Sequence, residues 1–169
     1  MIVIADTSPL HYLVLLEHLE HTEVLQHLYG RIIIPRAVVR ELQVDRTPPR
    51  VRQWIANPPS WLEVREITVP PDPALAELDP GEREAIALAE ALRADALVLD
   101  EKSGRREAER RKLRVIGTVR VLDDAAEADL VDLPAALERL QALGFYLDKK
   151  LMQLLLERHS ARRRRKNEP

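Results

Sequence analysis

Short apolar runs alternate along this chain with longer segments in which apolar residues recur every three or four positions. Runs of this length are typical of buried strands, and there are four of them, at 2–5, 31–34, 96–99 and 115–117. The longer periodic segments predict helices, at about 9–28, 36–43, 79–94, 103–113 and 119–129. The alternation predicts an α/β fold, Rossmann-like, with a short parallel sheet flanked by helices.

Two further regions complete the pattern. Residues 44–75 give weaker signals because prolines interrupt them, although 61–69 is strand-like. Farther along, Asp132 and Asp148 each predict a helix start, and Gly144 predicts the end of the first of these two helices. We therefore expect a C-terminal helical hairpin.

Length and charge bear on domain organisation. A chain of 169 residues suits one domain with one apolar core, and we assign it to 1–160, including the C-terminal helices. Residues 161–169 contain a run of like charges and are expected to form a basic, flexible tail. The net charge of -2 conceals an asymmetry, since 1–30 contains no Lys or Arg whereas 102–114 and 158–166 are strongly basic.

Composition also excludes some chemistry. The chain has no cysteine, so disulfides, thiolate metal sites and cysteine nucleophiles are excluded. The N-terminus lacks the positive region of a signal peptide, and no uncharged stretch is long enough to span a bilayer. We expect a cytoplasmic protein that does not enter a membrane.

Acidic residues follow the predicted strands or lie early in the predicted helices. Asp6 ends the first apolar run, just before Ser8 and Pro9, which are typical of a helix start. Asp100 directly follows the third run, and Glu41 lies on the short helix after the second. Ligands of open α/β sheets bind at the carboxyl ends of the strands, so these acids predict a site there.

The fourth acid is Glu84 or Glu82. Asp79, Pro80 and Glu82 have the spacing of a helix-capping motif, which gives Glu82 a local structural role. Glu84 has no such role and is the preferred ligand candidate, with Glu82 as its substitute. Ser8 is expected to be a helix cap that also supports the site.

Several carboxylates at one sheet edge would repel one another unless a cation neutralised them. Mg²⁺ and Mn²⁺ prefer oxygen ligands, and such an ion can activate water for hydrolysis of a phosphodiester. The basic segment that follows Asp100 suits a phosphate backbone, although a solvated helix face explains it equally well. Its candidate nucleic-acid contacts are Lys102, Arg105 and Arg106.

The motifs, taken in order, resemble a PIN domain, the fold of many prokaryotic toxin ribonucleases. The resemblance is strongest to a PIN-like branch of poorly characterised function. It is carried by Ile4-Ala5-Asp6-Thr7-Ser8-Pro9-Leu10, Ile34-Pro35-Arg36-Ala37-Val38-Val39-Arg40-Glu41-Leu42, Leu78-Asp79-Pro80-Gly81-Glu82-Arg83-Glu84-Ala85-Ile86, Val98-Leu99-Asp100 and Gly117-Thr118.

This resemblance implies a Mg²⁺- or Mn²⁺-dependent ribonuclease that acts on RNA. It also implies a homodimer and a neutralising antitoxin protein as partners. The implied acidic quartet, which would both bind the metal and carry catalysis, is Asp6, Glu41, Glu84 and Asp100. Two features depart from the family pattern: the third acid is Glu where many PIN nucleases have Asp, and Glu101-Lys102-Ser103-Gly104-Arg105-Arg106 replaces the Asp-x-Asp-Phe type of ending.

Two alternatives remain open. A non-catalytic PIN-like module that binds nucleic acid or protein would have acids that do not converge, or that pair with arginines. A phosphohydrolase for small molecules would have a closed pocket instead of an open groove.

Overall fold

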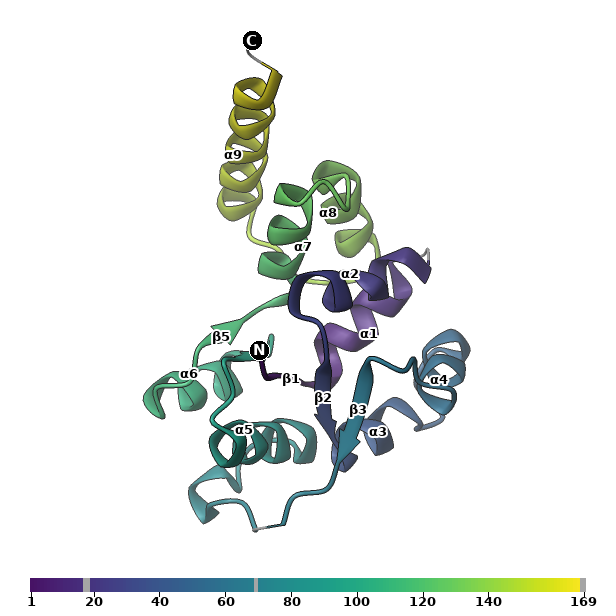
Figure 1. Cartoon of the computed structure of the whole chain (residues 1–169), viewed down its shortest axis with the longest axis vertical. Coiled ribbons are helices and arrows are strands. Elements are labelled where there is room, and N and C mark those ends of the chain that lie inside the picture. Colours follow the sequence, from purple (N-terminus) through teal and green to yellow (C-terminus); the bar gives the residue numbers. More distant parts are fainter. Residues whose placement is uncertain (17–18, 69, 168–169) are drawn as a thin grey trace. The chain divides into compact units, whose positions relative to one another are not determined.

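A parallel sheet in the order β3-β2-β1-β4-β5 organises the first of two compact units in this computed structural model. The structure describes residues 1–16, 19–68 and 70–167, with side chains for the same residues except 19–22 and 167. The first unit is Met1–Thr118 and the second is Val119–Pro169. Figure 1 shows β1, β2 and β3 side by side.

The strands of the first unit are β1 (Val3–Ala5), β2 (Ile32–Pro35), β3 (Leu62–Arg65), β4 (Ala96–Val98) and β5 (Val115–Ile116). Its helical segments are α1 (Thr7–Leu15), α2 (Leu19–Tyr29), α3 (Arg36–Leu42), α4 (Pro49–Ala56), the 3₁₀ turn η1 (Pro73–Leu75), α5 (Pro80–Leu92) and α6 (Lys102–Arg110). The second unit contains most of α7 (Thr118–Glu127), then α8 (Leu133–Ala142) and α9 (Lys149–Asn167).

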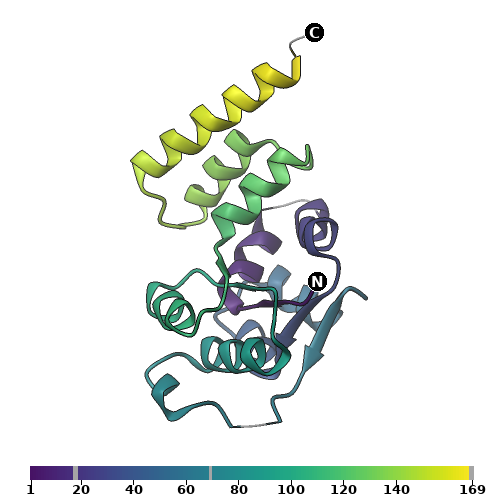
Figure 2. The same ribbon diagram turned by 60° about the vertical axis from the view of Figure 1, so that its left-hand side comes forward.

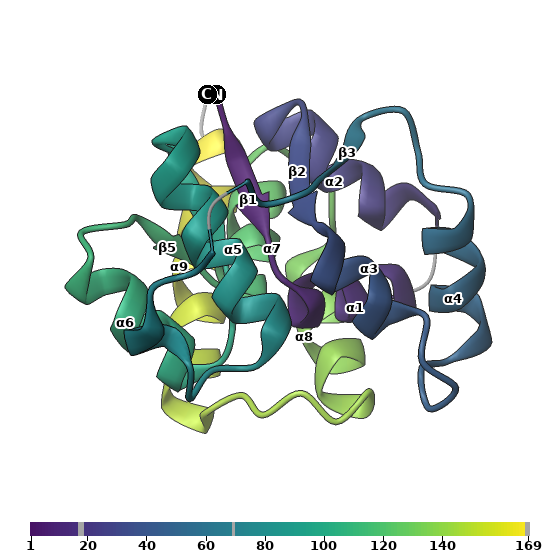
Figure 3. The same cartoon turned by 90° about the horizontal axis from the view of Figure 1, so that it is seen from below.

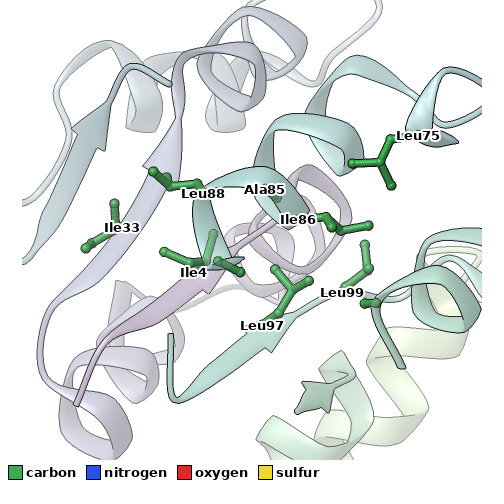
Figure 4. Close-up of a cluster of buried hydrophobic side chains, with 10 residues drawn as sticks. Ile4, Ile33, Leu75, Ala85, Ile86, Leu88, Leu97 and Leu99 are labelled. Atoms are coloured by element: carbon green, nitrogen blue, oxygen red, sulfur yellow. The ribbon is translucent and has the colours of Figure 1, made fainter. Parts of the chain in front are cut away.

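The apolar runs form the sheet because their residues are buried on both faces, as parallel strands require. Val3 pairs with Ile32 on one side and Ala96 on the other, which makes β1 the central strand. Ile4 packs with side chains of β2, β4 and α5 in one core cluster, drawn in Figure 4. Its neighbours Val3 and Ala5 are fully buried as well.

Strand order brings distant parts of the sequence to one sheet edge. β1 and β4 are adjacent and parallel, so their carboxyl ends lie together, and the backbone N–H of Asp6 donates to the Val98 carbonyl at 3.0 Å. β1 leads directly into α1, beside α3, as Figure 3 shows. The residues that follow these strands are therefore held near one another by the backbone.

Ion pairs join α7 to α9 in the second unit, where α8 and α9 form a helical hairpin (Figure 2). The buried Asp123 carboxylate pairs with Arg162 and lies 3.7 Å from the Arg158 guanidinium. Lys166 pairs with Asp129 at 2.7 Å. α9 continues to Asn167, so 161–167 is helical, and the flexibility of the basic tail stays a prediction.

The predicted α/β architecture is confirmed, and two details are corrected. The single helix predicted for 9–28 is wrong: α1 ends at Leu15 and α2 begins at Leu19, and no Gly or Pro at 10–28 indicates a break. The weak region 44–75 contains α4, β3 and η1; β3 covers part of the predicted strand, whose last residue, Val69, lies outside the described residues. The predicted domain boundaries stay a prediction.

No helix within the described residues is both long enough and apolar enough to cross a membrane.

Candidate active site

Asp6 lies between β1 and α1, where it occupies the N-cap position of α1. Its side chain is only 3% exposed, and its Oδ1 has no hydrogen-bond partner among the described residues. The pKa of Asp6 is raised to about 7, chiefly by burial; the backbone N–H of Thr7 lowers it, and the nearby charges of Glu41, Glu82 and Asp100 contribute to the rise. The site thus contains a carboxyl that resists ionisation.

The Glu41 side chain extends from α3 toward Asp6. Its Oε2 accepts a hydrogen bond from the Thr7 hydroxyl, and its Oε1 accepts one from the backbone N–H of Gly81 at 2.7 Å. A Cβ at position 81 would overlap Glu41 Oε2 and would lie 3.0 Å from Asp6 Oδ1. Gly81 is therefore where α5 approaches both carboxylates closely.

Glu82 is the third acid that the structure brings to this site. One carboxylate oxygen, Oε2, accepts the backbone N–H of Asp79 at 3.2 Å in a capping box at the start of α5. The other, Oε1, is buried without a hydrogen-bond partner among the described residues. Burial raises the pKa of Glu82, so its free oxygen resembles that of Asp6.

Asp100 follows β4 and is held by hydrogen bonds on both oxygens. Thr118 donates its backbone N–H to Oδ1 and its hydroxyl to Oδ2, each at 2.7 Å. The Ser8 hydroxyl also donates to Oδ2 at 3.2 Å, but the helix cap predicted at Ser8 is wrong, because Asp6 occupies the N-cap position of α1. Burial raises the pKa of Asp100, and these hydrogen bonds and the Arg105 charge partly offset that rise.

Glu84, the preferred third acid in the sequence, does not converge with the others. Its carboxylate accepts the backbone N–H of Ala37 at 3.0 Å and pairs with Arg40 at 3.1 Å. Two helical positions differ by about 200°, so Glu82 and Glu84 leave α5 in nearly opposite directions. The structure therefore places Glu82, and not Glu84, at the cavity with Asp6 and Glu41, and which acid is a ligand stays a prediction.

A cavity of about 580 Å³ is lined by Asp6, Glu41 and Glu82, whereas Asp100 and Glu84 are not among its lining residues. Its lining residues are Asp6, Thr7, Ser8, His11, Glu41, Arg46, Thr47, Asp79, Pro80, Glu82 and Glu101. Sequence reasoning did not assign Thr7, His11, Arg46 or Thr47 to the site. Thr7 directly follows Asp6, and His11 lies one helical turn after Thr7 on α1, so both had a local signal, whereas Arg46 and Thr47 reach the cavity through tertiary packing.

The three predicted nucleic-acid contacts are not among the described residues that line this cavity. Arg105 donates to the Leu99 carbonyl at 3.1 Å and lies near Asp100, so it supports the strand end. Lys102 and Arg106 are exposed on α6. Whether they contact nucleic acid stays a prediction.

Metal binding has support and one opposing observation. Asp6 and Glu82 each present a buried carboxylate oxygen without a partner, which fits a hard cation. Across the described part of the chain, however, no three His, Asp or Glu side chains are assembled to hold an ion. Mg²⁺ is commonly held by one or two carboxylates plus waters, so the donor set fits an ion that keeps much of its hydration.

The chain belongs to the PIN domain family, because a family model described as a PIN domain matches residues 2–161. A similar solved structure is that of a PilT N-terminus domain protein, SSO1118, from the hyperthermophilic archaeon Sulfolobus solfataricus P2. The two are 18% identical with a TM-score of 0.50, over 82% of this chain and 95% of that chain. Identity this low supports the fold alone. No curated protein matches this chain.

PIN domains are in general nucleases that use divalent metals, and the fold of this chain is nuclease-like.

Proposed function

We propose that this protein is a divalent-metal-dependent ribonuclease that hydrolyses RNA phosphodiesters. The observation that carries the proposal is the pair of buried, unpartnered carboxylate oxygens, Asp6 Oδ1 and Glu82 Oε1, beside a cavity at the carboxyl edge of the sheet. Leaving a buried polar atom unpaired is unfavourable. Such atoms at a cavity therefore suggest a ligand that supplies positive charge.

Each acid has a distinct role in this proposal. Asp6 and Glu82 would hold Mg²⁺ or Mn²⁺, with Glu41 as the third acid facing the same point. The Thr7 hydroxyl and the Gly81 N–H keep Glu41 oriented, and Thr118 and Ser8 do the same for Asp100. A bound ion would supply a Lewis acid that activates water and stabilises the leaving oxygen.

The cavity chemistry fits a phosphodiester only together with a bound cation. Five of the lining residues are acidic, which would repel a polyanion unless a cation lay between them and the phosphate. RNA as substrate implies action in the cytoplasm. The family resemblance extends the proposal to the toxin of a toxin–antitoxin pair.

Two partners belong to the same proposal, a second copy of the chain and an antitoxin protein. The α8–α9 hairpin is the candidate surface, because Leu151 and Leu154 on α9 are 43% and 52% exposed. Exposed apolar side chains that lie close together are typical of interaction sites. Sedimentation of the purified protein would show whether it dimerises.

The proposed function is tested by cleavage of structured and unstructured RNA with Mn²⁺, with Mg²⁺ and with a chelator. We expect Asp6→Asn and Glu82→Gln to lose activity by about a hundredfold or more. Glu84→Gln is the matched control, since it lies on the same helix and pairs with Arg40 outside the cavity, and it should remain active. Cleavage that survives both substitutions and the chelator would contradict the proposal.

A second candidate is a non-catalytic PIN-like module that binds nucleic acid or protein. The absence, within the described residues, of three ligands assembled for an ion favours it. This candidate predicts that RNA binds equally well with and without Mn²⁺ and is never cleaved.

A further inference from the structure

The acidic cavity contains one guanidinium. Arg46 is the single Lys or Arg among the described residues that line it, opposite five acids. It belongs to the α3–α4 loop, residues 43–48, which follows the helix carrying Glu41. The simplest explanation for a single cation at an acidic cavity is an ion pair with one of the lining acids. The contacts of Arg46 show whether it forms one.

Arg46 forms no such ion pair. No hydrogen bond or salt bridge holds its exposed guanidinium to any other described residue. Other arginines near the site are engaged: Arg105 donates to the Leu99 carbonyl, and Arg40 pairs with Glu84. Arg46 thus differs from these neighbours in having all its donors available to a ligand.

The backbone next to Arg46 is anchored through Thr47. The buried Thr47 donates its hydroxyl to the Glu41 carbonyl at 3.2 Å and its N–H to the Val44 carbonyl at 2.9 Å. On the other side, Asp45 is fully exposed, and its ion pair with Arg52 at 3.6 Å adds little restraint. The loop therefore holds Arg46 at a set position relative to Glu41, while its side chain remains free.

A guanidinium with these properties suits one ligand chemistry in particular. Its planar fork of donors matches two phosphate oxygens, and a charge-assisted bond of this kind is stronger than a neutral one. A carboxylate-lined cavity accepts a phosphate more readily when a fixed cation faces the phosphate from the side. The lining acids cannot serve in that role, because they carry the same sign of charge as the phosphate.

We propose that Arg46 is a substrate-binding residue that holds the phosphate backbone of single-stranded RNA at the mouth of the acidic cavity. This inference rests on the proposed ribonuclease function and adds a residue to its substrate site. Sequence analysis placed the backbone contacts on α6 instead. The structure points to the α3–α4 loop because that loop lines the cavity.

The test measures RNA affinity without catalysis. A fluorescently labelled 2′-O-methyl oligonucleotide in chelator is titrated with the unsubstituted protein, Arg46→Gln, Arg46→Lys and Arg50→Gln. Arg50 is the matched control, an exposed arginine at the start of α4 that does not line the cavity. We expect Arg46→Gln to weaken binding about tenfold and to reduce the slope of log K against log salt by about 0.7.

Arg46→Lys should bind RNA more tightly than Arg46→Gln, because it keeps the positive charge, but less tightly than the unsubstituted protein, because it lacks the planar guanidinium donors. Arg50→Gln should bind as the unsubstituted protein does. The melting shift caused by Mn²⁺ should be unchanged or larger in Arg46→Gln, since removing a cation cannot weaken attraction for another cation. A smaller Mn²⁺ shift would instead mean that Arg46 merely supports the acids, and it would overturn the assignment.

Two further results separate this inference from the proposed function. Equal RNA affinity of Arg46→Gln and the unsubstituted protein, or no RNA binding by either, overturns the role of Arg46. A lack of metal-dependent cleavage by an unsubstituted protein that does bind RNA through Arg46 contradicts the ribonuclease proposal alone.

Discussion

Replacing Asp6 by Asn should stabilise the metal-free protein, and increasingly so as pH rises. Burial raises the pKa of Asp6 from its ordinary value of 3.8 to about 7. One pKa unit corresponds to about 1.4 kcal/mol, so ionised Asp6 lowers the free energy of unfolding by about 4 kcal/mol relative to a group with no shift. An uncharged amide of similar size avoids this loss.

The sign follows from proton binding. Between pH 4 and 7 the folded protein keeps a proton on Asp6 that the unfolded chain has released, so stability falls as pH rises through that window and levels off above it. The amide introduced by Asp6→Asn does not titrate in this range. We therefore expect the stability advantage of Asp6→Asn to grow by about 2 to 3 kcal/mol between pH 5 and pH 8.

Urea denaturation at both pH values, in chelator, measures this difference. Asp45→Asn controls for the general loss of a negative charge, because Asp45 is fully exposed, and its effect on stability should be small at both pH values. Mn²⁺ at pH 8 should then raise the melting temperature of the unsubstituted protein and leave Asp6→Asn unchanged, since only binding to the folded state stabilises it. The reasoning would be refuted if the free energies of unfolding of Asp6→Asn and the unsubstituted protein differed by the same amount at pH 5 and at pH 8.

Three other substitutions give distinct outcomes. Gly81→Ala should cost about 1 to 3 kcal/mol by urea denaturation and reduce the Mn²⁺ melting shift, because its methyl group would overlap Glu41. Thr118→Val should cost about 1 to 3 kcal/mol, and more at pH 8 than at pH 4, because it removes the hydroxyl that donates to buried Asp100. Asp123→Ala removes the buried partner of two α9 arginines, so hydrogen exchange of α9 amides should accelerate while RNA cleavage rates stay within about twofold.

Most of the fold could be predicted because strand and helix signals are local. Val3–Ala5 is a continuous apolar run that ends at an acid, and the structure buries all three residues in the central strand. The error at 9–28 has the opposite origin, since a helix that stops without Gly or Pro leaves no local signal. Tertiary packing decides such a break, and sequence periodicity does not report it.

The acids that directly follow strands were also predictable. Asp6 and Asp100 follow adjacent parallel strands, so topology alone brings them together. The third acid at the cavity was not predicted correctly, because the helix-capping role of Glu82 was taken to exclude a role as a ligand. A carboxylate has two oxygens, and the capping box of α5 uses only one of those of Glu82. Arg46 was missed for another reason: its loop lies in the proline-interrupted region, and tertiary contacts such as that of Thr47 with the Glu41 carbonyl place it at the cavity.

The two free carboxylate oxygens imply that folding, proton binding and cation binding compete at one place. Asp6 and Glu82 are each buried, and each has a raised pKa caused chiefly by burial. At Asp6 a proton neutralises this charge below about pH 7, whereas a divalent cation can neutralise it above that pH, where the carboxylate is ionised. Metal affinity should therefore rise with pH up to about 7, the range over which the metal-free fold becomes less stable. A buried acid with a purely structural role would not need an open cavity beside it. A hydrogen-bond donor at that place would pair with its free oxygen at every pH.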